Sequence, residues 1–249
     1  MWGQRVRQAA QAAAIAASFL LVFAIVAFAQ QPDPRQNAPG KFDFYVLALS
    51  WSPSYCASVK ERAPGREPGL QCSGRPFAFV VHGLWPQYEQ GFPSYCQVSA
   101  ERLTHSIVSG MLDLMPSPQL IFHAWQRHGT CSGLTPPAYF ETLRKARALV
   151  KIPPDYLDPP SPVTVAPEAV ADAFLKANPG LTRTEIAVTC DKTRLTEVRL
   201  CLAKDFAFHD CPEVAQRSCK RDKVLMPAVR AGATDKRAAL DSAIVLSLH

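Results

Sequence analysis

Apolar residues along the chain follow two patterns, short runs typical of strands and longer stretches with helical spacing. The strand patterns predict strands at residues 42–50, 77–81, 184–190 and 195–202, the last two forming a hairpin. Helical spacing predicts helices that begin after Ser99, at Pro118, at Tyr139 and at Pro167. Because strands and helices are mixed without regular alternation, we expect an α+β fold.

Polar, proline and glycine residues mark where these elements end. Ser117 and Pro118 form a typical helix start, with serine as the N-cap and proline in the first turn. Gly129 is a typical residue just past a helix end. Residues 63–74 and 152–167 are rich in proline or glycine and are expected to be loops.

The first 29 residues resemble an export signal. Two arginines precede an uncharged apolar run at residues 12–27, and Ala-Phe-Ala at 27–29 is a small-x-small cleavage site. We expect cleavage before Gln30, with an uncleaved membrane anchor as the alternative, because the run is close to the shortest that spans a bilayer. No later segment resembles a membrane span, so no stable membrane association is expected after cleavage.

The remaining chain is interpreted as three parts. Residues 30–41 are a flexible lead-in, and residues 228–249 are a C-terminal extension with no clear periodicity. No convincing linker divides residues 42–227, which we interpret as one disulfide-stabilised domain.

The eight cysteines all follow the predicted signal. They are Cys56, Cys72, Cys96, Cys131, Cys190, Cys201, Cys211 and Cys219. Outside the cytosol an even set most simply forms four disulfides, and the last four, crowded in one segment, are expected to pair among themselves. A zinc site is the weaker alternative, because the chain has no Cys-x-x-Cys pair.

The composition excludes a disordered or collagen-like chain. Hydrophobic residues make up 48% of the 249 residues and charged residues 19%, and the 12 glycines have no collagen period. The formal net charge of +6 is mildly basic, which is compatible with a polyanionic substrate.

Three of the six histidines lie in two compact segments, residues 80–87 and 123–131. His82 follows an apolar run and is expected at a strand end. His123 and Arg127 are four residues apart on one helix, one turn from each other, and His128 follows near its end. Two imidazoles and a cation suit metal-free phosphoryl transfer, because one imidazole removes a proton while the other donates one. The alternative is that these histidines only form structural hydrogen bonds.

A zinc metallohydrolase is a weaker interpretation of the same helix. His123 and His128 are five residues apart rather than four, and no glutamate lies between them. No glycine-rich phosphate loop and no G-x-S-x-G motif occur either. We therefore expect neither a metal nor another cofactor.

Both segments closely resemble the two active-site signatures of the ribonuclease T2 family. The first, usually H-G-L-W-P, is complete from His82 to Pro86, and the second, usually H-E-W-x-K-H-G-T-C, matches residues 123–131 with two departures. Residues 47–53 also resemble the family's first strand. The resemblance covers about residues 42–227. It implies an antiparallel sheet with packed helices and a secreted ribonuclease with little base specificity.

The resemblance also implies a role for each matching residue. His82 corresponds to the general acid that protonates the leaving 5′-oxygen, His128 to the general base, and His123 to the phosphate-binding histidine. Arg127 stands where the family usually has lysine, and keeps the positive charge. Trp85 corresponds to a base-stacking aromatic residue, with core packing as the alternative.

Two more residues of these segments, Gln87 and Trp125, are also expected to bind substrate. The resemblance suggests a Cys96–Cys131 disulfide joining the two segments. For the other cysteines we expect three pairs, Cys56–Cys72, Cys190–Cys219 and Cys201–Cys211, although sequence alone leaves the pairing open.

Ala124 is the serious departure, because the family usually has a catalytic glutamate there. On a helix that glutamate would lie beside His128. We expect weakened activity rather than none, because the loss of one such catalytic group often lowers the rate by a factor of about 10²–10³. The alternative is a protein that kept the fold but only binds RNA or a partner. Glu89 is near in sequence, but its position in space cannot be predicted.

The partner predicted from these residues is RNA. DNA lacks the 2′-hydroxyl and should not be cleaved. We expect a monomer located in the periplasm or secreted, and an acidic pH optimum, since one histidine has to be protonated while the other is neutral.

Overall fold

The computed structural model describes residues 36–229 except positions 66, 68 and 98. The predicted signal at residues 1–29 and residues 230–249 of the C-terminal extension lie outside the described residues. Among the residues described, no helix is long and apolar enough to cross a membrane.

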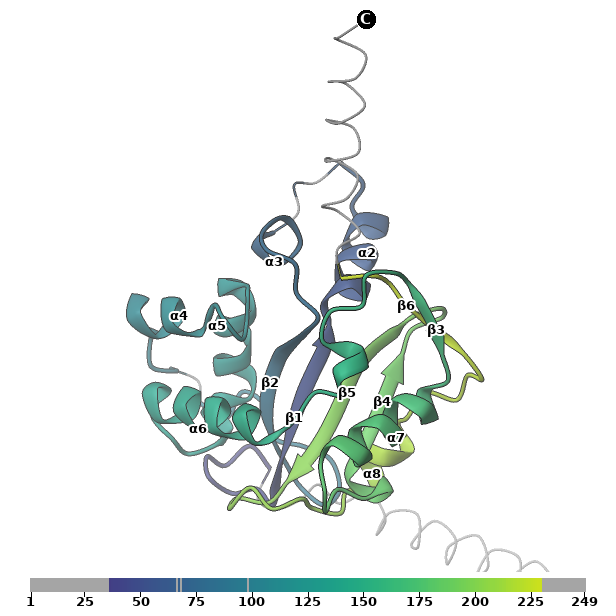
Figure 1. Cartoon of the computed structure of the whole chain (residues 1–249). Coiled ribbons are helices and arrows are strands. Elements are labelled where there is room, and N and C mark those ends of the chain that lie inside the picture. The colour runs from purple at the N-terminus through teal and green to yellow at the C-terminus, as the bar shows by residue number, and fades with distance from the viewer. Residues whose placement is uncertain (1–35, 66, 68, 98, 230–249) are drawn as a thin grey trace, which may run out of the picture. The chain divides into compact units, whose positions relative to one another are not determined.

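A four-stranded antiparallel sheet lies at the centre, in the order β2-β1-β5-β4 (Figure 1). Its strands are β1 (Phe44–Trp51), β2 (Phe79–Gln87), β4 (Ile186–Cys190) and β5 (Leu195–Leu202). A separate two-stranded sheet joins β3 (Val163–Val165) to β6 (Val224–Met226). The expected α+β class with an antiparallel sheet is confirmed, as is the predicted hairpin, β4–β5.

Side chains alternate between the two faces of the sheet along each strand, and the two faces differ in composition. On β1, Leu47 and Leu49 are fully buried in the main core, which also receives Val198 and Leu200 of β5. The opposite face carries a smaller apolar cluster that includes Val46. The second face is therefore less filled by apolar side chains, which leaves room for polar groups.

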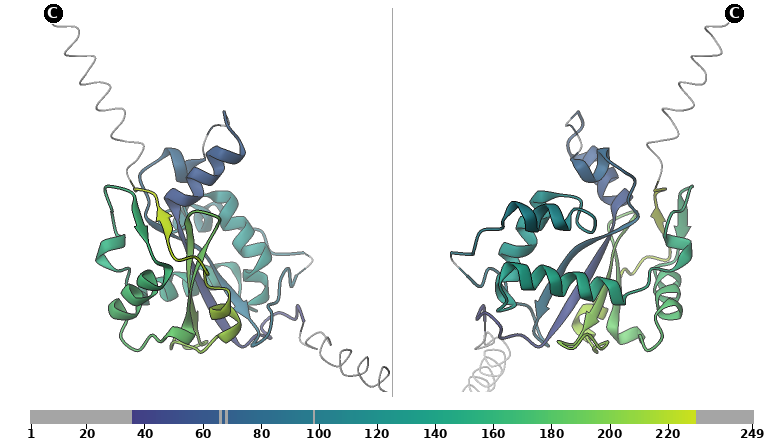
Figure 2. Two further views of the ribbon diagram at one scale, coloured as in Figure 1. Left: turned by 90° about the vertical axis from the view of Figure 1, so that its right-hand side faces the viewer. Right: turned by 60° about the vertical axis from the view of Figure 1, so that its left-hand side comes forward.

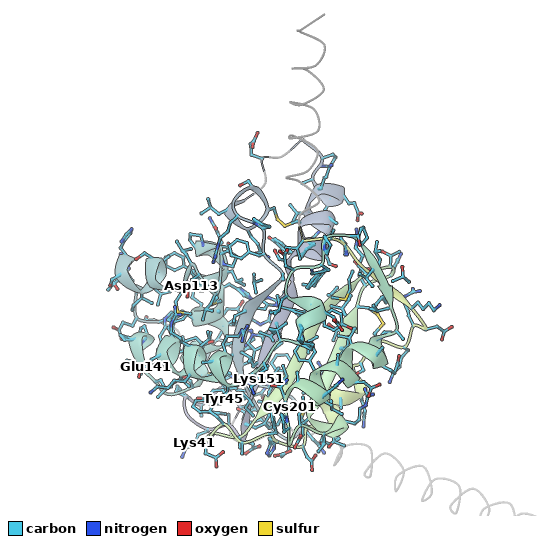
Figure 3. The ribbon with its side chains drawn as sticks, in the orientation of Figure 1. Lys41, Tyr45, Asp113, Glu141, Lys151 and Cys201 are labelled. Atoms are coloured by element: carbon cyan, nitrogen blue, oxygen red, sulfur yellow. A yellow bond between two sulfur atoms is a disulfide. The ribbon has the colours of Figure 1, made fainter. Side chains whose placement is uncertain are left out.

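Helices gather beside both edges of the sheet. The group near β2 consists of α4 (His105–Met111), α5 (Pro118–Arg127) and α6 (Pro136–Leu149), and the group near β4 consists of α7 (Pro167–Ala177) and α8 (Pro212–Gln216) (Figure 1). Figure 2 shows α6 lying along the sheet. Asp113, labelled in Figure 3, follows α4 and accepts hydrogen bonds from Arg144 of α6 at 2.8 Å, which links the two helices.

The remaining helices were not predicted from the sequence. They are α2 (Ser52–Arg62), α3 (Leu70–Ser73), and the 3-10 turns η1 (Gly129–Cys131), η2 (Pro154–Tyr156) and η3 (Arg183–Glu185). The prediction of a loop at residues 63–74 is wrong where the chain forms α3. The segment 152–167, also predicted to be a loop, contains η2 and β3. The apolar pattern missed α2 because its buried residues are the polar Ser52 and Ser54.

Two predicted helix starts need correction. The helix expected from Tyr139 begins at Pro136, with prolines in its first turn. The first helix begins at His105 rather than after Ser99, because the Thr104 hydroxyl caps it by accepting a hydrogen bond from the Ile107 amide at 3.4 Å. The start at Pro118 is confirmed, with Ser117 as the N-cap. Gly129 follows α5, but it lies outside the left-handed region and begins η1.

All eight cysteines form disulfides, paired Cys56–Cys72, Cys96–Cys131, Cys190–Cys219 and Cys201–Cys211. These are the pairs expected from the sequence and the resemblance. The zinc alternative is wrong for the cysteines, because each sulfur is bonded to another sulfur.

Candidate active site

The two histidine segments meet at one cavity of about 230 Å³. Its lining includes His82, Trp85 and Gln87 from β2, and His123, Arg127 and His128 from α5 and its end. Arg199 from β5 and Glu213 and Arg217 from the α8 region complete its polar lining. The cavity thus gathers histidines and cations that are distant in the sequence.

His82 lies inside β2, not at a strand end as expected. Val81 pairs with Leu49 of β1 and Gly83 pairs with Ala48, so His82 is the extra residue of a β-bulge. A bulge bends its strand and redirects the side chain of the extra residue. The strand then continues to Gln87 because the residues on either side of His82 along β2 remain paired with β1.

The His82 side chain is held by a carboxylate that the sequence analysis did not find. Its Nδ1 is hydrogen-bonded to Oε1 of Glu197, which is on β5 and 7% exposed. Ser50 of β1 donates to the same oxygen at 3.1 Å. The other oxygen accepts from Nε and Nη2 of Arg199 at 2.9 and 2.7 Å.

Glu197 is ionised at any working pH. Burial acts to raise the pKa of its carboxyl group, but the hydrogen bond and charge of His82, together with Arg199, outweigh burial and lower the pKa to about 2. The carboxylate is therefore a permanent negative charge against His82.

The end of α5 places the other histidines. His123 and Arg127 lie one turn apart and both line the cavity, as expected from their spacing. His128 is the C-cap, and its amide donates to the Ala124 carbonyl at 3.1 Å. The His123 and His128 rings are 6.2 Å apart between centroids.

His128 is buried, with 8% of its surface exposed. Burial, followed by the charges of Arg127, His123 and His82, lowers the pKa of His128 to about 3. Its Nδ1 has no hydrogen-bond partner within the described part of the chain, nor does Nε of Arg127. His128 is thus a neutral imidazole beside a cation with unused donor capacity.

Trp85 lies between the two catalytic candidates. Its ring stacks on His128 with centroids 5.1 Å apart and meets His82 edge-on at 5.4 Å. The guanidinium of Arg199 lies 5.1 Å from the same ring. A β-carbon on Gly83 would lie 2.4 Å from Nε1 of Trp85, so glycine is needed for this indole position.

Comparison with known proteins identifies the family. The model of the Ribonuclease T2 family matches residues 42–211, which contain both histidine segments. The chain belongs to the ribonuclease T2 family.

Individual relatives are similar over parts of their length. The chain is 48% identical over 96 residues to a ribonuclease of Aeromonas hydrophila, covering 39% of this chain but only 40% of that protein. It is 27% identical over 225 residues to ribonuclease DdI of Dictyostelium discoideum, covering 82% of this chain and 94% of the relative. The RNase-related protein from Calystegia sepium has a similar fold, with a TM-score of 0.58, 22% identity and coverage of 76% and 98%.

Of the two further residues expected to bind the substrate in this ribonuclease T2 fold, one lines the cavity and the other does not. Gln87 lines the cavity, although its Nε2 donates to the Pro86 carbonyl at 2.8 Å. Trp125 does not line it. Its indole is 2% exposed, packs near Tyr139 and donates to the Glu101 carbonyl at 2.8 Å. The substrate-binding role expected for Trp125 is therefore corrected to core packing.

The position of Ala124 carries no carboxylate, and Glu89 does not replace it. Ala124 is 1% exposed and packs in the main core. Glu89 pairs with His209 at 3.0 Å outside the cavity lining. The carboxylate that contacts a histidine of the cavity is Glu197, on the side of His82.

Glu197 was missed because it comes from a strand about 70 residues after the second signature. A signal was nevertheless present in the sequence. Glu197 and Arg199 alternate with the apolar residues of β5, which places both on the face opposite the main core. Among the described residues, no group of three or more His, Cys, Asp or Glu side chains is arranged to hold a metal ion.

Proposed function

We propose that the chain is an exported endoribonuclease that cleaves single-stranded RNA, with little base specificity, by metal-free transesterification. The observation that carries this proposal is the difference between two histidines of one cavity. His82 is paired with a carboxylate, whereas His128 is buried, neutral and surrounded by positive charge. One is suited to donate a proton and the other to accept one.

The proposed reaction needs only groups of the chain and of the RNA. His128 takes the proton of the 2′-hydroxyl, and the 2′-oxygen forms a bond to the adjacent phosphorus. The bond from phosphorus to the 5′-oxygen breaks, and His82 gives its proton to that oxygen. The products are a 2′,3′-cyclic phosphate and a free 5′-hydroxyl, and water opens the cycle in a later step.

His123 and Arg127 are proposed to stabilise the phosphate during this step. Both line the cavity, and the guanidinium can bind a phosphate oxygen through two donors. Burial lowers the pKa of His128, and the neighbouring cations lower it further. A bound phosphate anion offsets their charge and makes His128 a better base when substrate is present.

Trp85 and Gln87 are proposed to bind the substrate near the reacting phosphate. The Trp85 ring is partly exposed between the two histidines, and we propose that a nucleic-acid base contacts its exposed part. Stacking on an aromatic ring is tolerant of base identity, which agrees with the proposed lack of strong base specificity.

The proposal is tested with the disulfide-intact protein, a short RNA and the matching DNA, in EDTA at pH 5–7. We expect RNA ends carrying 2′,3′-cyclic phosphate by mass spectrometry and intact DNA. His82→Ala and His128→Ala should each abolish cleavage. Cleavage that persists in both variants, or that EDTA stops, would contradict the proposed mechanism.

A second candidate function is favoured by Ala124. Without the usual glutamate, the same cavity could bind RNA or a partner without cutting it. In that case folded protein retains RNA in a binding assay and releases no cyclic-phosphate product.

We also propose that the chain acts as a monomer in the periplasm or outside the cell, without a stable membrane association after signal cleavage. The four disulfides support an oxidising compartment.

A further inference from the structure

Glu197 and His82 meet across an intervening strand. Glu197 is on β5, His82 is on β2, and β1 lies between them. Strands separated by one neighbour are roughly 10 Å apart, so only long side chains can bridge them over small ones. On this face β1 supplies Ala48 and Ser50, opposite Arg199 and Glu197.

The local sequence therefore builds the contact from three strands. Small residues on β1 leave the space, the bulge on β2 redirects His82, and β5 supplies the carboxylate. Ser50 and Arg199 bind Glu197 as well, so both carboxylate oxygens are engaged. Such a fully hydrogen-bonded group holds its position.

We propose that Glu197 is a positioning residue of the active site, which holds His82 through Nδ1–H and presents Nε2 as the nitrogen that protonates the leaving oxygen. This inference rests on the proposed function. A carboxylate can only accept at this contact, so Nδ1 has to carry the hydrogen. The tautomer of an imidazole is set by the hydrogen bond that its other nitrogen makes.

The proposal also explains how the site retains a carboxylate although Ala124 has none. In this chain the carboxylate orients the acid rather than standing beside the base. The other titratable side chains around His82 are cations or further histidines, namely Arg199 on β5 and His123, Arg127 and His128 at α5. Across the cavity Glu213 is engaged with Arg217 and the Gly91 amide. Glu197 is thus the acidic side chain in contact with His82.

The first test reads the tautomer of His82 directly and does not depend on RNA cleavage. Nitrogen-15 NMR of the imidazoles, with His82→Gln to assign the signal, should show neutral His82 protonated at Nδ1. In Glu197→Ala, neutral His82 should move toward the Nε2–H tautomer, which free imidazole side chains prefer in water. A wild-type His82 in the Nε2–H form would overturn the proposal, whether or not the protein cleaves RNA.

The second test is kinetic and uses Glu197→Gln, which keeps the shape of the side chain and removes its charge. We expect kcat to fall roughly 10²-fold with KM little changed, because Glu197 acts through His82 and does not bind the phosphate.

The matched control is Glu89→Gln. It removes the carboxylate of another Glu–His pair, 3.0 Å from His209 and outside the cavity lining. This variant should keep the wild-type kcat and KM. If Glu197→Gln behaves like this control while the wild type cleaves RNA, Glu197 has no positioning role. If the wild type does not cleave RNA, the proposed function fails, and the NMR result alone decides the placement of His82.

Discussion

His128 shows at the scale of one residue how function and stability oppose each other. Its ring is buried against Trp85 and surrounded by positive charge, so folding keeps it neutral. A neutral imidazole is what a general base requires. The same environment costs stability in acid, because the unfolded chain takes up a proton that the folded chain refuses.

The first prediction concerns this proton. The pKa of His128 is about 3 in the folded protein and near its usual value in the unfolded chain. The unfolded state therefore binds more protons between about pH 3 and 6.5, and the free energy of unfolding falls as the pH falls through that window. The contribution is up to about 1.4 kcal/mol per pH unit.

His128→Gln should show a shallower decline in that window, measured by denaturant unfolding at a series of pH values. His105→Gln, a change of an exposed histidine at the start of α4, controls for the loss of a histidine as such. Equal slopes for wild type and His128→Gln would show that His128 is not held neutral.

Glu197 has the same direction of effect in a lower window. Its folded pKa of about 2 lies below the unfolded value, so its contribution to stability is present above that unfolded value and is lost as the pH falls through the folded pKa. The two groups thus act on different parts of one acid-unfolding curve.

At the scale of elements, glycine sets the end of α5. Gly129 does not supply a left-handed turn, as a glycine after a helix often does. A β-carbon there would lie 2.4 Å from Cε3 of Trp125 and 3.0 Å from Cδ1 of Tyr139. The glycine allows close packing directly after His128, and so fixes where that side chain enters the cavity.

The second prediction follows from this packing. Gly129→Ala should destabilise the protein by about 1–3 kcal/mol, because both aromatic rings are buried and have little room to move. It should also lower kcat, since the end of α5 shifts. Gly110→Ala in α4 is the control, because nothing lies within 4 Å of its added β-carbon. Urea unfolding and RNA cleavage are measured for both variants. A loss seen in Gly129→Ala but not in Gly110→Ala is due to packing and not to the general effect of replacing glycine by alanine.

The same elements show what the sequence could predict. Strands with one apolar face and the helix beginning at Ser117 and Pro118 carry local signals, and these elements were confirmed, although β2 runs to Gln87 instead of ending at Val81. The bulge at His82 and its contact with Glu197 were not predictable in this way. They depend on the register of three strands, which no single segment encodes.

The candidate site residues show the same difference between local and long-range signals. His82, His123, Arg127 and His128 could be selected as candidates because each lies within a contiguous signature, and the fold brings all four to one cavity. Trp125 was misassigned because a signature does not state which side of a helix faces the substrate. Ala124 also packs into the main core, which its position within the signature does not indicate.

At the scale of the whole molecule, disulfides connect the sheet, the loops and the site. Cys96–Cys131 ties the segment after β2 to η1, directly beyond His128. Next to it the Tyr95 amide donates to the Arg127 carbonyl at 2.9 Å. Cys190–Cys219 instead joins the end of β4 to the segment after α8. The two segments that this disulfide joins also share a backbone hydrogen bond, in which the Cys219 amide donates to the Val188 carbonyl at 2.7 Å.

The third prediction compares these two bridges, whose sequence separations of 35 and 29 residues are nearly the same. Loop-closure entropy assigns each roughly 4 kcal/mol, so Cys96→Ala/Cys131→Ala and Cys190→Ala/Cys219→Ala should lose similar stability in denaturant unfolding. Their effects on catalysis should differ, when cleavage is measured at a temperature where both variants remain folded. The first variant should lose kcat because Arg127 and His128 are less firmly held, whereas the second should retain most of it. Equal kcat values for the two folded variants would mean that α5 alone, without its disulfide, positions the base.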